Sequence, residues 1–110
     1  GNSDTAGTQP FATNPWHGIA LMQLRRNKRG VRFAADEAVD TAAGLETYTR
    51  NGAYVGFEEA TKGALAPGLL GDLAVYADDP LALDAERLPD VEADLVAVGG
   101  RVVYRRGEAR

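Results

Sequence analysis

KGALAPGLLGDLAVYADDPL, residues 62–81, is the stretch that decides how this chain folds. It consists of short apolar runs separated by Pro and Gly, a pattern typical of strands and turns. Pro67-Gly68 predicts a type II turn, because Pro presets the first central dihedral and Gly supplies the positive φ of the second. Residues 72–76 are then predicted to form a strand, which Asp78-Asp79-Pro80 ends. A β half of the chain therefore begins near Lys62.

The C-terminal residues continue this β half. Residues 94–98 and 101–105 are rich in apolar and β-branched side chains, and Gly99-Gly100 between them predicts a hairpin with a two-residue turn. Residues 81–90 are expected to be irregular, with one helical turn around residues 84–88. We expect Asp72 to support the Pro-Gly turn by accepting hydrogen bonds from nearby backbone N–H groups, and we interpret Asp78 and Asp79 as turn residues rather than a catalytic carboxylate pair.

The residues before the β half have helical character. Asn14 is a favoured N-cap and Pro15 suits the first helical position, so a helix is predicted to begin at Pro15. Its apolar stripe comprises Trp16, Ile19, Ala20 and Leu24. The basic run Arg25–Arg29 is interpreted as the end of this helix before Gly30, where cations complement the helix dipole. A nucleic-acid or targeting patch is the less favoured interpretation of the same run.

A second helix is predicted after Asp40. Leu45, Tyr48 and Val55 are spaced so that they share one side, and a break is expected near Asn51-Gly52, followed by a short helix over residues 53–57. Residues 1–13 are small and polar and are predicted to form a loop or a disordered arm. We therefore expect an α+β protein that divides near residue 61, into residues 1–61 and residues 62–110.

Composition narrows the classes of function. The chain has 110 residues, with 12 Lys and Arg against 16 Asp and Glu, and a formal net charge of −4. This balance argues against a general affinity for nucleic acid or for anionic membranes. Because the chain has no Cys and one His, His17, it lacks a thiol nucleophile and cannot build a self-contained His-rich metal site. His17 itself is interpreted as a packing or surface residue.

The hydropathy and the N-terminal residues indicate where the protein is located and whether the chain is part of a longer protein. No apolar run approaches the roughly 20 residues that a membrane-spanning helix needs, and the N-terminus lacks the features of a signal peptide. We therefore expect a cytoplasmic protein that binds neither membrane nor nucleic acid. The chain starts at Gly1 and its one methionine is Met22, which predicts a processed, excised or tag-derived N-terminus and a piece of a longer protein.

Several motifs resemble the amidohydrolase superfamily, and in particular its branch called amidohydrolase family 3. Residues 62–81 are similar to the family's Gly-x-Leu, Pro-Gly turn, strand and Asp-Pro-Leu, with Gly71 where the family usually has Ala. The hairpin Val98-Gly-Gly-Arg-Val-Val-Tyr104 is similar to the family's C-terminal hairpin. Upstream, Asn14-Pro-Trp-His-Gly-Ile19 and Tyr48-Thr-Arg-Asn-Gly-Ala-Tyr54 resemble helices near the end of its barrel. The resemblance covers nearly the whole chain in the family's order.

The resemblance implies the C-terminal portion of a TIM-barrel hydrolase. Residues 1–61 would form the last barrel loop and helices, and residues 62–110 part of a small composite β-sandwich. It also implies a divalent metal, with zinc favoured, in the full-length enzyme, whereas no cofactor is expected in this chain alone. Gly1-Asn-Ser-Asp4 resembles the family's Gly-Ser-Asp after the last barrel strand, which would make Asp4 both a metal ligand and a catalytic carboxylate.

Two hypotheses about function follow. The leading one is a C-terminal fragment of a metal-dependent hydrolase that cleaves a non-peptide carbon-nitrogen bond of a small-molecule substrate with a metal-activated water, and that is inactive alone. The competing one is an independent binding or regulatory domain without catalysis. The three or four expected strands leave open sheet edges, through which we expect homo-oligomers to form.

Overall fold

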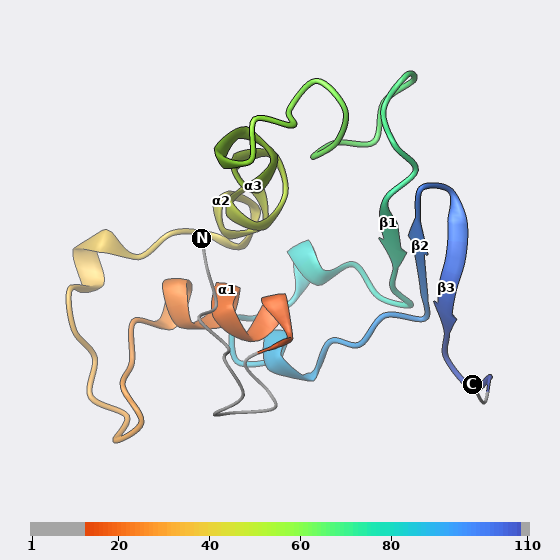
Figure 1. Ribbon diagram of the computed structural model, residues 1–110. Helices are drawn as coiled ribbons and strands as arrows, with labels where there is room; N and C mark the ends of the chain where they lie inside the picture. Colours follow the sequence, from red (N-terminus) through yellow and green to blue (C-terminus); the bar gives the residue numbers. More distant parts are fainter. Residues whose placement is uncertain (1–12, 109–110) are drawn as a thin grey trace.

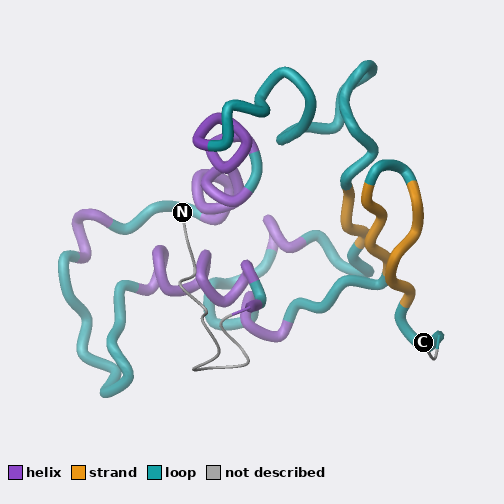
Figure 2. The backbone as a smooth tube through the Cα atoms, in the orientation of Figure 1, coloured by secondary structure: helices purple, strands orange, loops and turns teal. Residues whose placement is uncertain are grey.

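The computed structural model describes residues 13–108, in which helices precede strands along the chain (Figure 1). Three α-helices come first: α1 (Pro15–Leu24), α2 (Thr41–Tyr48) and α3 (Arg50–Val55). Strands β1 (Leu73–Val75), β2 (Leu95–Val98) and β3 (Arg101–Arg105) follow and form a separate sheet at one end of the molecule (Figure 2). The α+β class expected from the sequence is therefore confirmed.

Helix α1 begins as predicted and ends earlier than predicted. The side chain of Asn14 accepts a hydrogen bond from the N–H of Trp16, and Pro15 occupies the first turn. At the other end Arg25 adopts a left-handed conformation, with φ 49°, and its N–H donates to the carbonyl of Leu21. The basic run Arg25–Arg29 therefore lies outside the helix, and its interpretation as cations on the helix dipole is wrong.

Helices α2 and α3 pack above α1 in Figure 1. Asp40 caps α2, because its side chain accepts from the N–H of Ala43. The break predicted near Asn51-Gly52 lies earlier, at Thr49, so the following helix starts at Arg50. Val55 is 76% exposed rather than on the inner side, because the break at Thr49 gives α3 its own axis and the spacing from α2 no longer applies.

The core is small and centres on α1. Trp16, Ile19 and Ala20 are buried as the predicted stripe requires, and Leu88 from the distant segment before β2 completes the cluster. Partly buried side chains pack around it, namely those of Leu24, Leu45, Tyr48, Tyr76, Leu83 and Val91. One cluster therefore holds the helices to the irregular segment that joins β1 to β2.

The sheet is antiparallel, with strand order β1-β2-β3. The hairpin between β2 and β3 is confirmed, and both turn residues, Gly99 and Gly100, have positive φ, as a primed two-residue turn requires. The register shifts between Val96 and Ala97, so that Val103 of β3 is the extra residue. The sheet's outer strands, β1 and β3, each leave one side unpaired within residues 13–108.

The segments around β1 follow the sequence predictions with one addition and one correction. The Pro-Gly turn is present: Gly68 has φ 90° and the N–H of Leu69 donates to the carbonyl of Ala66 at 3.1 Å. The helical turn expected around residues 84–88 is present, since the N–H of Arg87 donates to the carbonyl of Asp84 at 2.8 Å, but the segment also contains two 3₁₀ helices that were not predicted, η3 (Pro80–Ala82) and η4 (Leu88–Asp90). Asp72 does not bond within the Pro-Gly turn, because its Oδ1 accepts from the N–H of Gly99 in the hairpin.

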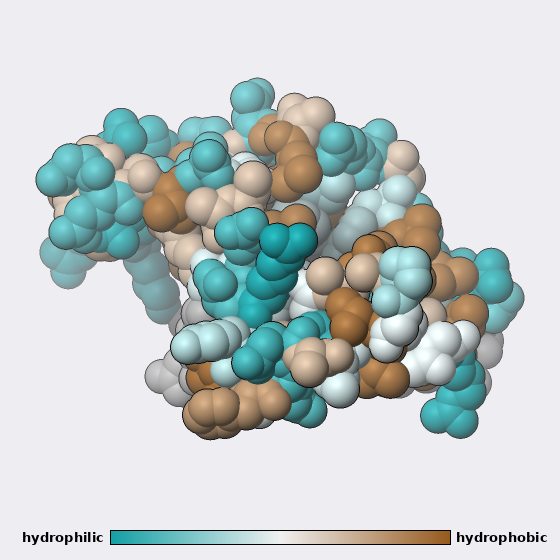
Figure 3. All heavy atoms as spheres, turned by 90° about the horizontal axis from the view of Figure 1, so that it is seen from above, coloured by the Kyte–Doolittle hydropathy of each residue, from teal (hydrophilic) through white to brown (hydrophobic). Residues whose placement is uncertain are grey.

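Much apolar surface stays exposed. Hydrophobic side chains reach the surface over the strands in Figure 3, and the exposed ones include Val75, Val98 and Val102. Among the described residues, no helix combines the length and the apolar character needed to cross a membrane.

Candidate functional site

A groove of about 1030 Å³ separates the helices α2 and α3 from strand β1 and the segment that follows it. Its walls come from three parts of the chain. Trp16 is supplied by α1; Leu45, Tyr48, Arg50 and Ala53 by the two upper helices; and Leu73, Tyr76, Asp79 and Leu81 by the β half. Such a hollow, where two parts of a fold meet, is the usual place for a ligand.

The inner part of this groove is aromatic. The rings of Trp16 and Tyr76 meet edge to face, with their centroids 5.5 Å apart and their planes at 82°. Trp16 is 4% exposed, and its indole Nε1 has no hydrogen-bond acceptor in the structure. An unsatisfied buried N–H costs about 1–3 kcal/mol, so the packing of the indole ring must outweigh that cost.

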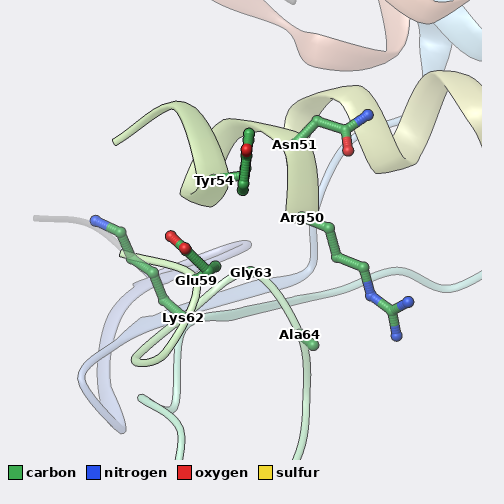
Figure 4. A pocket seen from close by; sticks show the side chains of 7 residues that line it. All are labelled: Arg50, Asn51, Tyr54, Glu59, Lys62, Gly63 and Ala64. Carbon is green, nitrogen blue, oxygen red and sulfur yellow. The ribbon is translucent and has the colours of Figure 1, made fainter. Parts of the chain in front are cut away.

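A smaller hollow of about 400 Å³ adjoins the groove and shares Arg50 and Lys62 with it (Figure 4). The Nζ of Lys62 lies 2.6 Å from Oε2 of Glu58, which neutralises this cation. Figure 4 shows the Arg50 side chain extending away from both Glu59 and Lys62. The charged groups of the hollow therefore do not converge on one point, and they form neither a metal site nor an acid-base pair.

The candidate metal residue predicted from the sequence, Asp4, lies outside the described residues, so its role stays a prediction. Within residues 13–108 no group of three or more His, Asp or Glu side chains is close enough to hold a metal ion. The described residues therefore supply no complete metal site of their own.

The other sequence candidates take structural places. His17 is half-buried in the first turn of α1. Asp79 caps η3, because its Oδ1 accepts from the N–H of Leu81 at 2.9 Å, which confirms its interpretation as a turn residue. Asp78 is exposed beside it. The groove itself was not predicted, because its lining combines residues from distant segments that share no local spacing.

Comparisons with known proteins agree on one family. Residues 1–104 match the family described as "Amidohydrolase family". The chain is 28% identical over 96 residues to YtcJ of Bacillus subtilis (strain 168), a protein named as an amidohydrolase. That match covers 84% of this chain and 18% of the relative, so the chain spans less than a fifth of the relative's length. No solved structure matches the chain significantly.

Proposed function

Because this chain belongs to the amidohydrolase family, we propose that it is the C-terminal portion of a cytoplasmic hydrolase that cleaves a non-peptide carbon-nitrogen bond in a small-molecule substrate. The observation that carries this proposal is the family match, which runs over residues 1–104. The hydrolase is proposed to use a water activated by a divalent metal, with zinc favoured. The segment alone is proposed to be inactive, since its described residues contain no cluster of three or more His, Asp or Glu side chains that could hold a metal ion.

We assign the helices and the sheet to different layers of that larger enzyme. Helices α1, α2 and α3 are proposed to be the last helices of a TIM barrel, and β1, β2 and β3 part of a small β-sandwich beside it. The apolar side chains on both faces of the sheet support its assignment to a β-sandwich. Val75 and Val102 share one face with Ala97, while Val98 and Tyr104 share the opposite face, as the strand register dictates. A sheet that is apolar on both faces is expected to be covered on both.

The cover is proposed to come from another part of the longer protein. Val75, Val98 and Val102 are 47%, 55% and 47% exposed here, and β1 and β3 each offer an unpaired edge. The relative is more than five times longer than the matched region, which leaves ample chain to supply further strands. In the isolated segment the same edges are proposed to pair with a second copy.

Asp4 is the one residue of this chain that we propose as a metal ligand and a catalytic carboxylate. Its metal partners are proposed to belong to other parts of the longer protein, in keeping with the described residues, which contain no cluster of three or more His, Asp or Glu side chains that could hold a metal. This assignment rests on the resemblance of residues 1–4 to the family's Gly-Ser-Asp. A carboxylate at such a position can exchange a proton with the attacking water and the leaving nitrogen.

The proposal is tested on the longer protein that contains this segment. Formation of a new amino group is measured with linear amides, which release an amine, and with cyclic amides, which open to an amino acid, together with the metal content of the purified protein. Asp4→Asn is expected to lower kcat at least about 100-fold. The exposed Asp36→Asn is the matched control and is expected to leave kcat unchanged. If none of these substrates gives a new amino group, the hydrolase assignment is wrong. If Asp4→Asn is as active as the control, the Asp4 assignment is wrong.

A further inference from the structure

Residues 25–33, here called the basic finger, form an ordered projection rather than a helix end. Arg26 and Arg32 face each other in an antiparallel bridge, and the N–H of Phe33 donates to the carbonyl of Arg25 at 2.9 Å. At the tip, the Oδ1 of Asn27 accepts from the N–H groups of Arg29 and Val31 at 2.9 and 3.1 Å. The finger extends away from the body of the molecule at the left of Figure 1.

The base of the finger is fixed to the residues that follow it. Arg25 Nη2 lies 3.0 Å from Oε2 of Glu37, and Arg25 Nε donates to the carbonyl of Ala34. The same guanidinium stacks on the ring of Phe33, 4.9 Å from its centroid. These contacts hold the finger in one orientation, so that its tip is presented rather than free to fold back.

Charge is concentrated in the finger. Residues 25–33 carry five cationic side chains and no anionic ones, in a chain whose net charge is −4, so the remaining residues carry −9. Arg25 and Arg26 have carboxylate neighbours, whereas Lys28, Arg29 and Arg32 make no ion pair with a described residue.

A patch of opposite, negative charge lies on the same chain. Residues 78–92, here called the acidic segment, contain six carboxylates and one Arg. Four of its carboxylates are exposed and make no ion pair with a described residue: Asp78, Asp79, Asp84 and Asp90. The two surfaces adjoin within one chain, where Nη1 of Arg26 lies 3.9 Å from Oε1 of Glu86. Three cations of the finger and four carboxylates of the acidic segment still make no ion pair with a described residue, so both surfaces keep charge for a second copy.

We propose that the basic finger of one copy docks on the acidic segment of a second copy. Charge complementarity selects this partner, and exposed apolar side chains accompany it on both surfaces: Val31 and Phe33 on the finger, and Leu81 on the acidic segment. Nucleic acid is the less suitable partner, because the charge of −9 on the rest of the chain repels a phosphate backbone around so short a cationic track. The inference is independent of the hydrolase proposal, since neither surface contains Asp4.

The test uses two charge-reversed variants of the protein as its gene encodes it. One variant carries Lys28→Glu and Arg29→Glu in the finger, and the other carries Asp84→Lys and Asp90→Lys in the acidic segment. Self-association is measured by sedimentation velocity in 0.05 M and 0.5 M NaCl, as test conditions chosen to span weak and strong screening. Each variant alone is expected to associate at least about 10-fold more weakly than the wild-type protein at low salt.

Mixing the two variants separates docking from misfolding. The reversed finger of the first variant is complementary to the reversed segment of the second, and their unchanged surfaces are complementary as well. The mixture is therefore expected to recover association to within about 3-fold of the wild type. A control with the same charge change, Arg50→Glu with Arg101→Glu, alters cations outside the finger and is expected to associate as the wild type does.

Three results would overturn the proposal. One is wild-type self-association that does not weaken between 0.05 M and 0.5 M NaCl, the two test conditions. Another is a mixture that associates no better than either variant alone. The third is an unassociated wild-type protein whose finger instead binds a DNA duplex or an anionic vesicle, with loss of that binding in the finger variant.

Discussion

Gly44 of α2 lies directly on the side chain of Ile19 in α1. A Cβ at position 44 would come 2.7 Å from Cγ2 of Ile19, and Ile19 is fully buried, so it has no room to move. The absence of a side chain at this glycine is therefore what lets the two helices approach each other.

The first prediction is that Gly44→Ala destabilises the fold although alanine favours helices. Replacing a helical glycine by alanine gains about 1 kcal/mol from propensity, whereas overpacking a filled core costs about 1–3 kcal/mol. The expected net result is a loss of about 1 kcal/mol in the free energy of unfolding, measured by urea titration. Gly52→Ala in α3 is the control, because the nearest atom to its Cβ would be 3.8 Å away, and it is expected to stabilise by about 0.5–1 kcal/mol. Equal stabilisation by both changes would show that α1 and α2 do not touch at Ile19.

A second prediction concerns the bond between Asp72 and the hairpin. The Oδ1 of Asp72 accepts from the N–H of Gly99 at 2.7 Å, and the N–H of Gly100 donates to the carbonyl of Gly71 at 2.9 Å. Asp72→Ala removes the first bond and is expected to lower the free energy of unfolding by about 1 kcal/mol and to speed amide exchange at Gly99. Asp72→Asn keeps an acceptor oxygen and is expected to lose less than half as much. Unchanged exchange at Gly99 in the alanine variant would show that the bond does not form in solution.

Local signals account for the parts of the fold that the sequence predicts correctly. The start of α1 depends on Asn14 and Pro15, which act on the adjacent turn, and the hairpin depends on two glycines with positive φ. Each of these elements is determined within a few residues, so no tertiary information is needed.

The sequence-based predictions fail where contacts between residues far apart in the chain determine the structure. Helix α1 ends at Leu24 because Arg25 turns left-handed and engages Glu37, twelve residues on. The groove collects its lining from α1, from α2 and α3 and from the β half, so no spacing in the sequence announces it. The proposed site residue, Asp4, rests on the family resemblance alone, since one carboxylate carries no pattern of its own.

The third prediction separates the two roles of Asn14. Its Oδ1 accepts from the N–H of Trp16 at 3.0 Å, and its Nδ2 donates to the carbonyls of Pro89 and Val91 at 3.2 and 3.1 Å. Asn14→Ser keeps a capping oxygen but loses the reach to these two carbonyls, and is expected to cost about 1 kcal/mol. Asn14→Asp keeps the cap but places a carboxylate against two carbonyl oxygens, and is expected to cost at least as much as Asn14→Ala, about 2 kcal/mol. Thermal unfolding of the three variants gives the order, and an aspartate variant as stable as wild type would mean that the contact to Pro89 and Val91 is absent.

The fourth prediction tests whether the open sheet edge drives pairing of the isolated segment. Val103 is the extra residue of β3 and is 44% exposed at the outer edge of the sheet. Val103→Lys is expected to weaken self-association of the segment at least about 5-fold, because a charged side chain on an edge opposes strand pairing. Val55→Lys makes the same chemical change on α3, away from the sheet, and is expected to have no effect. Sedimentation is measured in about 0.5 M NaCl, because this salt screens the charges of the basic finger. Self-association that persists in this salt is then due to pairing at the sheet edge. If the segment is monomeric under these conditions, its sheet needs no further strand, and the independent-domain hypothesis gains over the fragment of a larger hydrolase.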